Sequence, residues 1–305
     1  MNVRDLEYLV ALAEYKHFRR AADACKVSQP TLSGQIRKLE EELNTILLER
    51  TSRKVLFTQS GLLLVDQARA ILREIKQFKD MASQQGKEMS GPLHLGVIPT
   101  LGPYLLPYIV STIKEEFPKI ELFLYEAKTP QLVELLENGK LDCAILPSKA
   151  ELDVFMNVSM FSEPMKLAVP KSHPFAARKT VDMKELHGKE ILMLDDGHCL
   201  RDNAVGYCFT VGAVENKHYQ ATSLETLHNM VASGLGITLI PELAVLADRC
   251  GKVVYVPCVN PTPSREIVMI YRPGSPLRKR YERVARAISE AVIPVIKQPE
   301  TKKSC

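Results

Sequence analysis

Residues 18–43 read FRRAADACKVSQPTLSGQIRKLEEEL and predict two helices joined by the turn Lys26-Val27-Ser28. Ser28 is a good N-cap for the second helix, and Pro30 stands in its first turn, where a missing N–H costs nothing. Leucine and isoleucine then recur at helical spacing and predict one buried face. Asn44 tolerates the left-handed conformation that ends many helices. Together these features indicate a helix-turn-helix.

The opposite face of this second helix is polar and basic, as in a helix that enters the DNA major groove. A basic turn follows at residues 50–54 and precedes a strand-like stretch at 55–57, which predicts a wing that contacts the DNA backbone. A solvated helix surface is the alternative interpretation. We assign the winged helix-turn-helix domain to residues 1–58. Its predicted DNA contacts are Gln29, Pro30, Thr31, Ser33, Arg37, Arg50 and Arg53.

Residues 59–90 predict a long linker helix and a hinge. Apolar residues alternate at spacings of four and three, a pattern typical of a short coiled-coil seam that pairs two copies of the chain. A helix that packs against its own chain is the alternative. The seam residues are Leu64, Ala68, Ile71, Ile75 and Phe78.

From residue 91 the pattern changes to strands that alternate with helices, which predicts an α/β fold with a parallel sheet. The first set of strands lies at 93–98, 120–125 and 143–146, and a similar second set follows. We divide this region into lobe I and lobe II, with a ligand cleft between them. Lobe I comprises residues 91–163 plus 268–300, lobe II comprises residues 164–267, and residues 301–305 form a tail.

Composition narrows the class of protein. The 305 residues carry a net charge of +4, and 46% of them are hydrophobic. We recognise neither a secretory signal nor a membrane span, so we expect a cytoplasmic protein. The seven cysteines form no CxxC pair. In a reducing compartment this predicts a transient disulfide rather than a structural one, and no metal or other cofactor.

Several segments resemble LysR-type transcriptional regulators. The stretch 18–43, followed by LLERTSRKVLFTQSG at 47–61, is similar to the winged helix-turn-helix of that family. GHCLRDNAVGYCF at 197–209, ATSLETLHNMVASGLGITLIP at 221–241 and YRPGSPLRKRYE at 271–282 resemble its peroxide-sensing branch. The resemblance covers nearly the whole chain. It implies a regulatory domain like a two-lobed periplasmic binding protein.

The same resemblance implies a function. The protein would be a transcription activator of antioxidant genes, not an enzyme, and would sense hydrogen peroxide through a reversible disulfide between Cys199, the peroxidatic thiol, and Cys208, the resolving thiol. It would bind promoter DNA as a homotetramer, a dimer of dimers, and recruit RNA polymerase. We expect a glutaredoxin or thioredoxin system as the reductant. Peroxide would be bound by Thr100, Thr129, His198 and Arg265.

The residues themselves support part of this picture. A thiol attacks peroxide as the thiolate, so we expect Cys199 to have a lowered pKa and access to solvent. Charges of both signs flank Cys199, and they leave this pKa open. If the segment between Cys199 and Cys208 is helical, its nine steps span about 13 Å. A disulfide needs Cα atoms within roughly 7 Å, so such a helix has to unwind before the bond forms.

Other interpretations remain. Taken alone, Thr129 is more often an N-cap, Arg265 a surface residue, and Cys199 and Cys208 buried core thiols, as we expect for Cys25, Cys143 and Cys258. A first rival function is a LysR-type regulator that binds a small-molecule co-inducer in the cleft. A second is a thiol peroxidase. A third is a zinc protein that uses His198, Cys199, Cys208 and His218.

Overall fold

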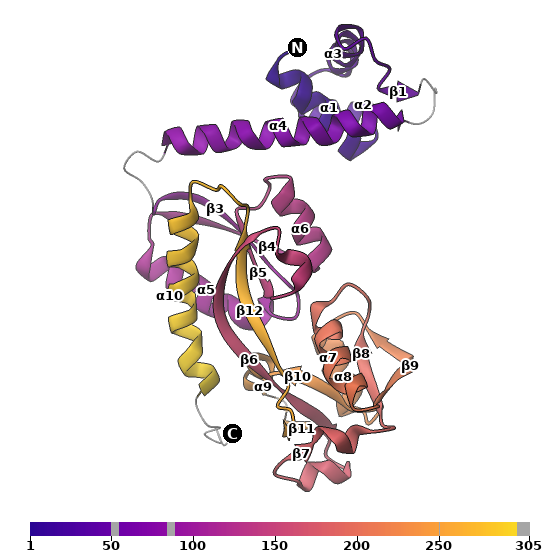
Figure 1. Cartoon of the computed structure of the whole chain (residues 1–305), viewed down its shortest axis with the longest axis vertical. Coiled ribbons are helices and arrows are strands. Elements are labelled where there is room, and N and C mark those ends of the chain that lie inside the picture. Colours follow the sequence, from indigo (N-terminus) through magenta and orange to yellow (C-terminus); the bar gives the residue numbers. More distant parts are fainter. Residues whose placement is uncertain (50–54, 84–88, 250, 298–305) are drawn as a thin grey trace. The chain divides into compact units, whose positions relative to one another are not determined.

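The computed structural model describes residues 1–49, 55–83, 89–249 and 251–297. The chain divides into two compact units, residues 1–85 and residues 86–305 (Figure 1). Each unit has its own buried core. We describe the two units separately.

The first unit is the predicted winged helix-turn-helix. Ser28 caps α3 by accepting a hydrogen bond from the Thr31 N–H at 3.3 Å, and Asn44 follows the helix with φ of 46°. The buried face of α3 carries Leu32, Ile36 and Leu39 as predicted. The basic turn at 50–54 lies outside the described residues. The elements are α1 (Val3–Tyr15), α2 (Phe18–Ala24), α3 (Gln29–Glu42), and the antiparallel strands β1 (Leu48–Glu49) and β2 (Leu56–Phe57).

Helix α4 (Gln59–Ser83) is the predicted linker helix. Its first half packs on the core of its own unit, where Val65 and Ala68 are buried and Leu64 and Ile71 partly so. Part of the predicted dimer seam therefore packs against the core of its own unit instead of facing a second copy of the chain. Phe78, further along, is 74% exposed and stays available for a partner. Among the residues described, we find no helix with the length and apolar character needed to span a membrane.

The second unit is built on a mixed sheet. Its strands lie in the order β4-β3-β5-β12-β6-β11-β7, and β10 also pairs with β6. Strands β3, β4 and β5 form the predicted parallel arrangement, and β7 pairs parallel with β11, but β6 and β12 pair antiparallel as they run between the two halves of the unit (Figure 1). Strands β8 and β9 form a separate parallel pair. The strands are β3 (Gly91–Val97), β4 (Ile120–Glu126), β5 (Cys143–Pro147), β6 (Met156–Pro170), β7 (Val181–Asp182), β8 (Glu190–Leu194), β9 (Val214–Ala221), β10 (Thr238–Pro241), β11 (Val253–Val259) and β12 (Ser264–Tyr271).

The second unit has two hydrophobic cores, and β6 contributes to both, with Met160 and Phe161 in the first and Met165 and Leu167 in the second. The first packs α5 (Gly102–Glu116) and α10 (Arg278–Lys297) against the sheet, and the second packs α8 (Leu224–Ala232). Our predicted lobe boundaries fall inside β6, which contributes residues to both cores, and inside β12, whose buried apolar residues belong to the first core. Helices α6 (Thr129–Glu137), α7 (Cys199–Thr210) and α9 (Glu242–Ala247) complete the unit.

Candidate functional site

The turn from β8 into α7 places Cys199 at the first position of the helix. Gly197 adopts φ of 85°, a left-handed conformation that suits glycine, just before the helix begins. His198 is the N-cap, but its side chain accepts no capping hydrogen bond. The N-terminal end of a helix favours a negative charge, such as a thiolate.

The thiol of Cys199 is buried against helix α6. Its side chain is 2% exposed, and its Sγ lies 2.6 Å from the Thr129 Oγ1. Lys128, not Thr129, occupies the N-cap position of α6, so the N-cap reading of Thr129 is wrong. Thr129 is the first helical residue, and its hydroxyl is directed at the thiol instead of the helix backbone.

The pKa of Cys199 departs from our expectation. Burial raises it above the usual range, and Asp202 adds to the rise. The Thr129 hydrogen bond and the charges of Lys149 and Arg265 lower it, but burial outweighs them. The expected solvent access and lowered pKa are therefore wrong for this conformation, because the thiol lies in the first core.

Arg265 and Thr100 form a second, fully buried cluster. Arg265 donates to the Thr100 Oγ1 and to the Thr100 carbonyl oxygen, both at 3.1 Å. Its guanidinium also pairs with Glu163 at 2.8 Å, and the other Glu163 oxygen accepts the Leu243 N–H at 3.0 Å. Arg265 is 2% exposed, so its reading as a surface residue is wrong. Glu163, which sequence reasoning missed, balances its charge.

His198 is buried and faces Asp195. Its Nε2 lies 3.0 Å from the Asp195 Oδ1, while Lys128 donates to the other Asp195 oxygen at 2.9 Å. Burial lowers the pKa of His198, and the Lys128 charge adds to this against the opposing pull of Asp195. The imidazole is therefore neutral near pH 7.

Cys208 lies near the other end of α7, inside the second core. Its side chain is fully buried, and burial raises its pKa to about 12, with a further contribution from Cys258. Both thiols are reduced. Because the segment between them is helical, their Cα atoms are about 13 Å apart, too far for a disulfide. For the same reason the two thiols cannot share one zinc ion in this conformation.

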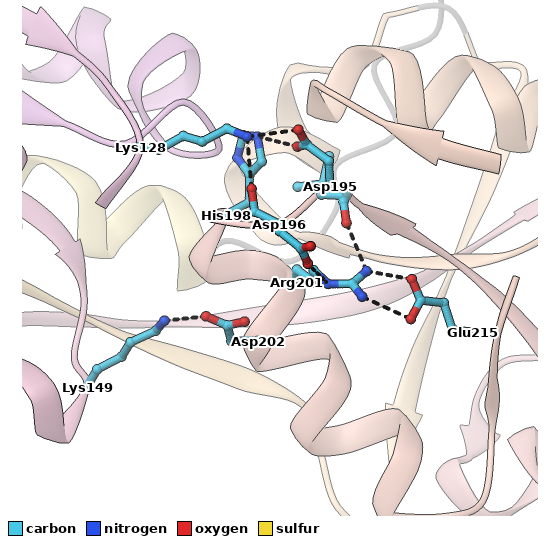
Figure 2. Close-up of polar contacts among 9 residues, drawn as sticks. Lys128, Lys149, Asp195, Asp196, His198, Arg201, Asp202 and Glu215 are labelled. Carbon is cyan, nitrogen blue, oxygen red and sulfur yellow. Dashed lines mark hydrogen bonds and ion pairs between the residues drawn. The ribbon is translucent and has the colours of Figure 1, made fainter. Parts of the chain in front are cut away.

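Ion pairs surround the first turn of α7, as Figure 2 shows. Lys149 pairs with Asp202, and Lys128 donates to the Asp196 carbonyl oxygen at 2.9 Å as well as to Asp195. Arg201 forms a two-pronged pair with Glu215 at 2.6 and 3.0 Å. Sequence reasoning missed Lys128, Lys149 and Glu215, since each acts across a long sequence separation. Among the described residues, no group of three or more His, Cys, Asp or Glu side chains is placed to hold a metal.

The predicted DNA-contact residues on α3 share one exposed face. None of these side chains contributes to the core of the first unit, and Arg37 pairs with Glu41 at 3.2 Å on the surface. Arg50 and Arg53 lie outside the described residues. The exposed members of the set are Gln29, Pro30, Thr31, Ser33 and Arg37.

Two family models match the chain. The bacterial regulatory helix-turn-helix protein model of the lysR family matches residues 3–62. The LysR substrate binding domain model matches residues 86–292. Together they account for both compact units.

Individual relatives agree with this. The "Hydrogen peroxide-inducible genes activator" of Haemophilus influenzae is 66% identical over 97% of this chain and 99% of its own length. A full-length OxyR variant from Pseudomonas aeruginosa has a TM-score of 0.78 at 32% identity, covering 100% of this chain and 99% of that one. A solved structure of the reduced form of OxyR has a TM-score of 0.62 at 52% identity and covers 67% of this chain and 97% of its own length. A solved structure of the oxidised form of OxyR has a TM-score of 0.63 at 54% identity and covers 68% of this chain and 98% of its own length. The chain therefore belongs to the LysR family of bacterial transcriptional regulators, in the branch of the hydrogen peroxide-inducible genes activators.

Proposed function

We propose that this protein is a DNA-binding transcription activator that senses hydrogen peroxide through Cys199 and Cys208. The observation that carries the proposal is the placement of the two thiols near opposite ends of α7, each in a different core. A disulfide between them cannot form without unwinding the helix, so the bond converts a chemical event into a conformational change. The names of the relatives, peroxide-inducible genes activators, support the same assignment.

In the first step the Cys199 thiolate attacks one oxygen of hydrogen peroxide. A sulfur–oxygen bond forms, the O–O bond breaks, and sulfur loses two electrons to the peroxide. The leaving hydroxide takes a proton and becomes water, and Cys199 becomes a sulfenic acid. Thr129 is placed to hold the peroxide, because its hydroxyl already contacts the sulfur at 2.6 Å.

Buried groups next to the thiol assist this step. The charge of Arg265 favours the thiolate, and Glu163 and Thr100 hold the guanidinium in place. We assign Thr100, Thr129, His198 and Arg265 to peroxide binding. His198 is neutral near pH 7, so the positive charge among these four residues is that of Arg265.

In the second step the Cys208 thiol attacks the sulfenic sulfur. A disulfide forms, and the sulfenic oxygen leaves as water with the thiol proton. Cys208 has to leave the second core, so α7 unwinds. Leu200, which is buried beside Cys199, and Phe209, which is 37% exposed, then change their surroundings. A glutaredoxin or thioredoxin system reduces the disulfide and resets the switch.

The first unit connects this switch to transcription. The exposed face of α3, from Gln29 to Arg37, enters the major groove, and Arg50 and Arg53 hold the DNA backbone. The protein acts in the cytoplasm as a homotetramer, a dimer of dimers. Oxidation changes how it contacts promoter DNA and recruits RNA polymerase to antioxidant genes.

Peptide mass spectrometry of the reduced, full-length protein after brief exposure to stoichiometric hydrogen peroxide tests the proposal. We expect a Cys199–Cys208 crosslink while the other five of the seven cysteines stay reduced. Cys199→Ser should abolish the crosslink. Unmodified Cys199 and Cys208 in a protein that still binds promoter DNA would refute peroxide sensing. Rapid, continuous peroxide consumption with a reductant would instead indicate a thiol peroxidase.

A pocket of about 470 Å³ favours a second candidate, a regulator that binds a small co-inducer. Its lining includes Tyr104 on α5 and His228 on α8, a helix of each core. Under this alternative, Cys199→Ser would leave the transcriptional response intact. A metabolite screen by thermal shift, carried out on that variant, distinguishes the two functions.

A further inference from the structure

Lys149 connects lobe I to the first turn of α7. It comes two residues after the end of β5 and is the N-cap residue of a short 3-10 helix, Ala150–Leu152. Its ammonium group forms an ion pair with the Asp202 carboxylate, 53 residues away in sequence (Figure 2). Because Asp202 comes three residues after Cys199 on the same helix, both side chains lie on neighbouring positions of one face. The Lys149–Asp202 pair therefore lies at the same turn of α7 as Cys199, and the Lys149 charge acts on the thiol.

Partial burial makes this cation effective. The Lys149 side chain is 23% exposed, so water screens its charge less than that of a free surface lysine. Burial lowers the pKa of Lys149, but Asp202 and Cys199 raise it by more than burial lowers it. The pKa of Lys149 therefore lies above its usual value, and the ammonium stays charged. In return Lys149 lowers the pKa of Cys199, while Asp202 raises it. One ion pair thus contains two charges with opposite effects on the thiol.

We propose that Lys149 is a further positioning residue of the thiol site, whose ammonium group, held by Asp202 at the start of α7, stabilises the Cys199 thiolate that attacks peroxide. This rests on the proposed function, because it assigns a part in the peroxide reaction. The groups that act on the thiol are then the Thr129 hydroxyl, Lys149, Arg265 and, with the opposite sign, Asp202.

Lys128, the other lysine beside α7, has a different role. It donates to the Asp195 carboxylate and to the Asp196 carbonyl oxygen, both at 2.9 Å. Its charge acts on His198 and Asp195. Lys149 has a single carboxylate to satisfy at the helix start, and the thiolate becomes its second anionic partner.

The test measures the first chemical step alone. Full-length protein carrying Cys208→Ser cannot form the disulfide, so unwinding of α7 does not affect the rate. Dimedone trapping and mass spectrometry give the rate of sulfenic acid formation at Cys199 between pH 6 and 9. The variants compared in this background are Lys149→Met, Lys149→Arg and Asp202→Asn.

The two halves of the ion pair should have opposite effects. Lys149→Met should slow oxidation at pH 7 about two- to fivefold, the range of a partly exposed charge pair, and shift the rate–pH curve to higher pH. Asp202→Asn should speed oxidation by a similar factor and shift the curve to lower pH. Lys149→Arg should restore the rate, because it keeps the charge.

A purely structural ion pair gives another result. If Lys149 only fastens α7 to lobe I, then Lys149→Met and Asp202→Asn shift the rate in the same direction or not at all, and the inference is wrong. Arg178→Met, which breaks the surface pair with Glu185, is the matched control and should leave the rate unchanged. Should the parent protein form no sulfenic acid at Cys199, it is the proposed function that fails.

Discussion

The two ends of helix α7 place chemically identical thiols in different surroundings. At the start, Cys199 contacts the Thr129 hydroxyl, and the charges of Lys149 and Arg265 act on it. Near the end, Cys208 is fully buried among the apolar residues of the second core. Burial raises both pKa values, but only at Cys199 do a hydroxyl and two cations oppose it.

In the proposed mechanism this difference sets the order in which the two thiols react. Cys199 ionises in place, because polar groups compensate part of the cost of a buried charge. Cys208 has a pKa of about 12 and reacts only after it leaves the core. The helix between them keeps the second thiol away until the first has been oxidised. Each prediction below tests whether the two ends differ in this way.

Removing either thiol gives the largest expected effect. Cys199→Ser should abolish both sulfenic acid and disulfide, because no other thiol in the described part of the chain has these neighbours. Cys208→Ser should still form sulfenic acid at Cys199 but no disulfide. Dimedone labelling and a promoter–reporter assay separate the two outcomes. Cys25→Ser, in the DNA-binding unit, is the control and should respond like the parent protein. Dimedone labelling of Cys208 in the Cys199→Ser variant would contradict the order of the two thiols.

Thr129→Val should have the next largest effect. The substitution keeps the shape of the side chain and removes the hydroxyl that contacts the Cys199 sulfur. A hydrogen bond to a charged group contributes about 1.5–3 kcal/mol, so oxidation of Cys199 should slow at least about tenfold. Stopped-flow measurements with excess peroxide give this rate. Thr129→Ser keeps the hydroxyl and should react much as the parent does; an equally slow Thr129→Ser would point to packing instead.

Raising the pH should release the Cys208 end of α7. The pKa of Cys208 is about 12 in the folded helix against 9.0 for a free thiol. The stability that comes from keeping this thiol protonated is complete below pH 9 and is lost as the pH rises toward 12. Between pH 8 and pH 10 the population with Cys208 outside the core should rise about tenfold. Limited proteolysis of residues 195–220 measures it. Cys208→Ser should remove most of this pH dependence; an unchanged dependence would mean that other groups control the helix.

Local patterns made the DNA-binding unit predictable from sequence. Ser28, Pro30 and Asn44 mark the ends of α3 through interactions within a few residues, and the structure confirms all three. Thr129 shows the limit of such reasoning. A threonine before a proline at a helix start resembles an N-cap, but α6 begins one residue earlier than this pattern predicts. Thr129 is therefore the first helical residue, and its hydroxyl contacts Cys199.

The thiol site depends on contacts that no local pattern reveals. Glu163 and Arg265 lie 102 residues apart and meet only because β6 and β12 pair in the sheet. The length of β6 was missed for a related reason. A strand that passes through two cores has no regular alternation of apolar and polar residues, so its full length gives no local signal. Lys149 and Asp202 likewise meet across the two lobes.

Gly206→Ala should have the smallest effect and tests the helix itself. Gly206 lies inside α7, and a Cβ added there meets no atom within 4 Å. Alanine therefore stabilises the helix by about 0.5–1 kcal/mol without a clash. Because the disulfide requires unwinding, its equilibrium constant should fall about two- to fivefold, which raises the reduction potential by roughly 10–20 mV. A glutathione redox titration measures this shift. Gly34→Ala, an equally open glycine in α3, should leave the potential unchanged. An unchanged potential in Gly206→Ala would mean that the disulfide forms without unwinding this part of α7.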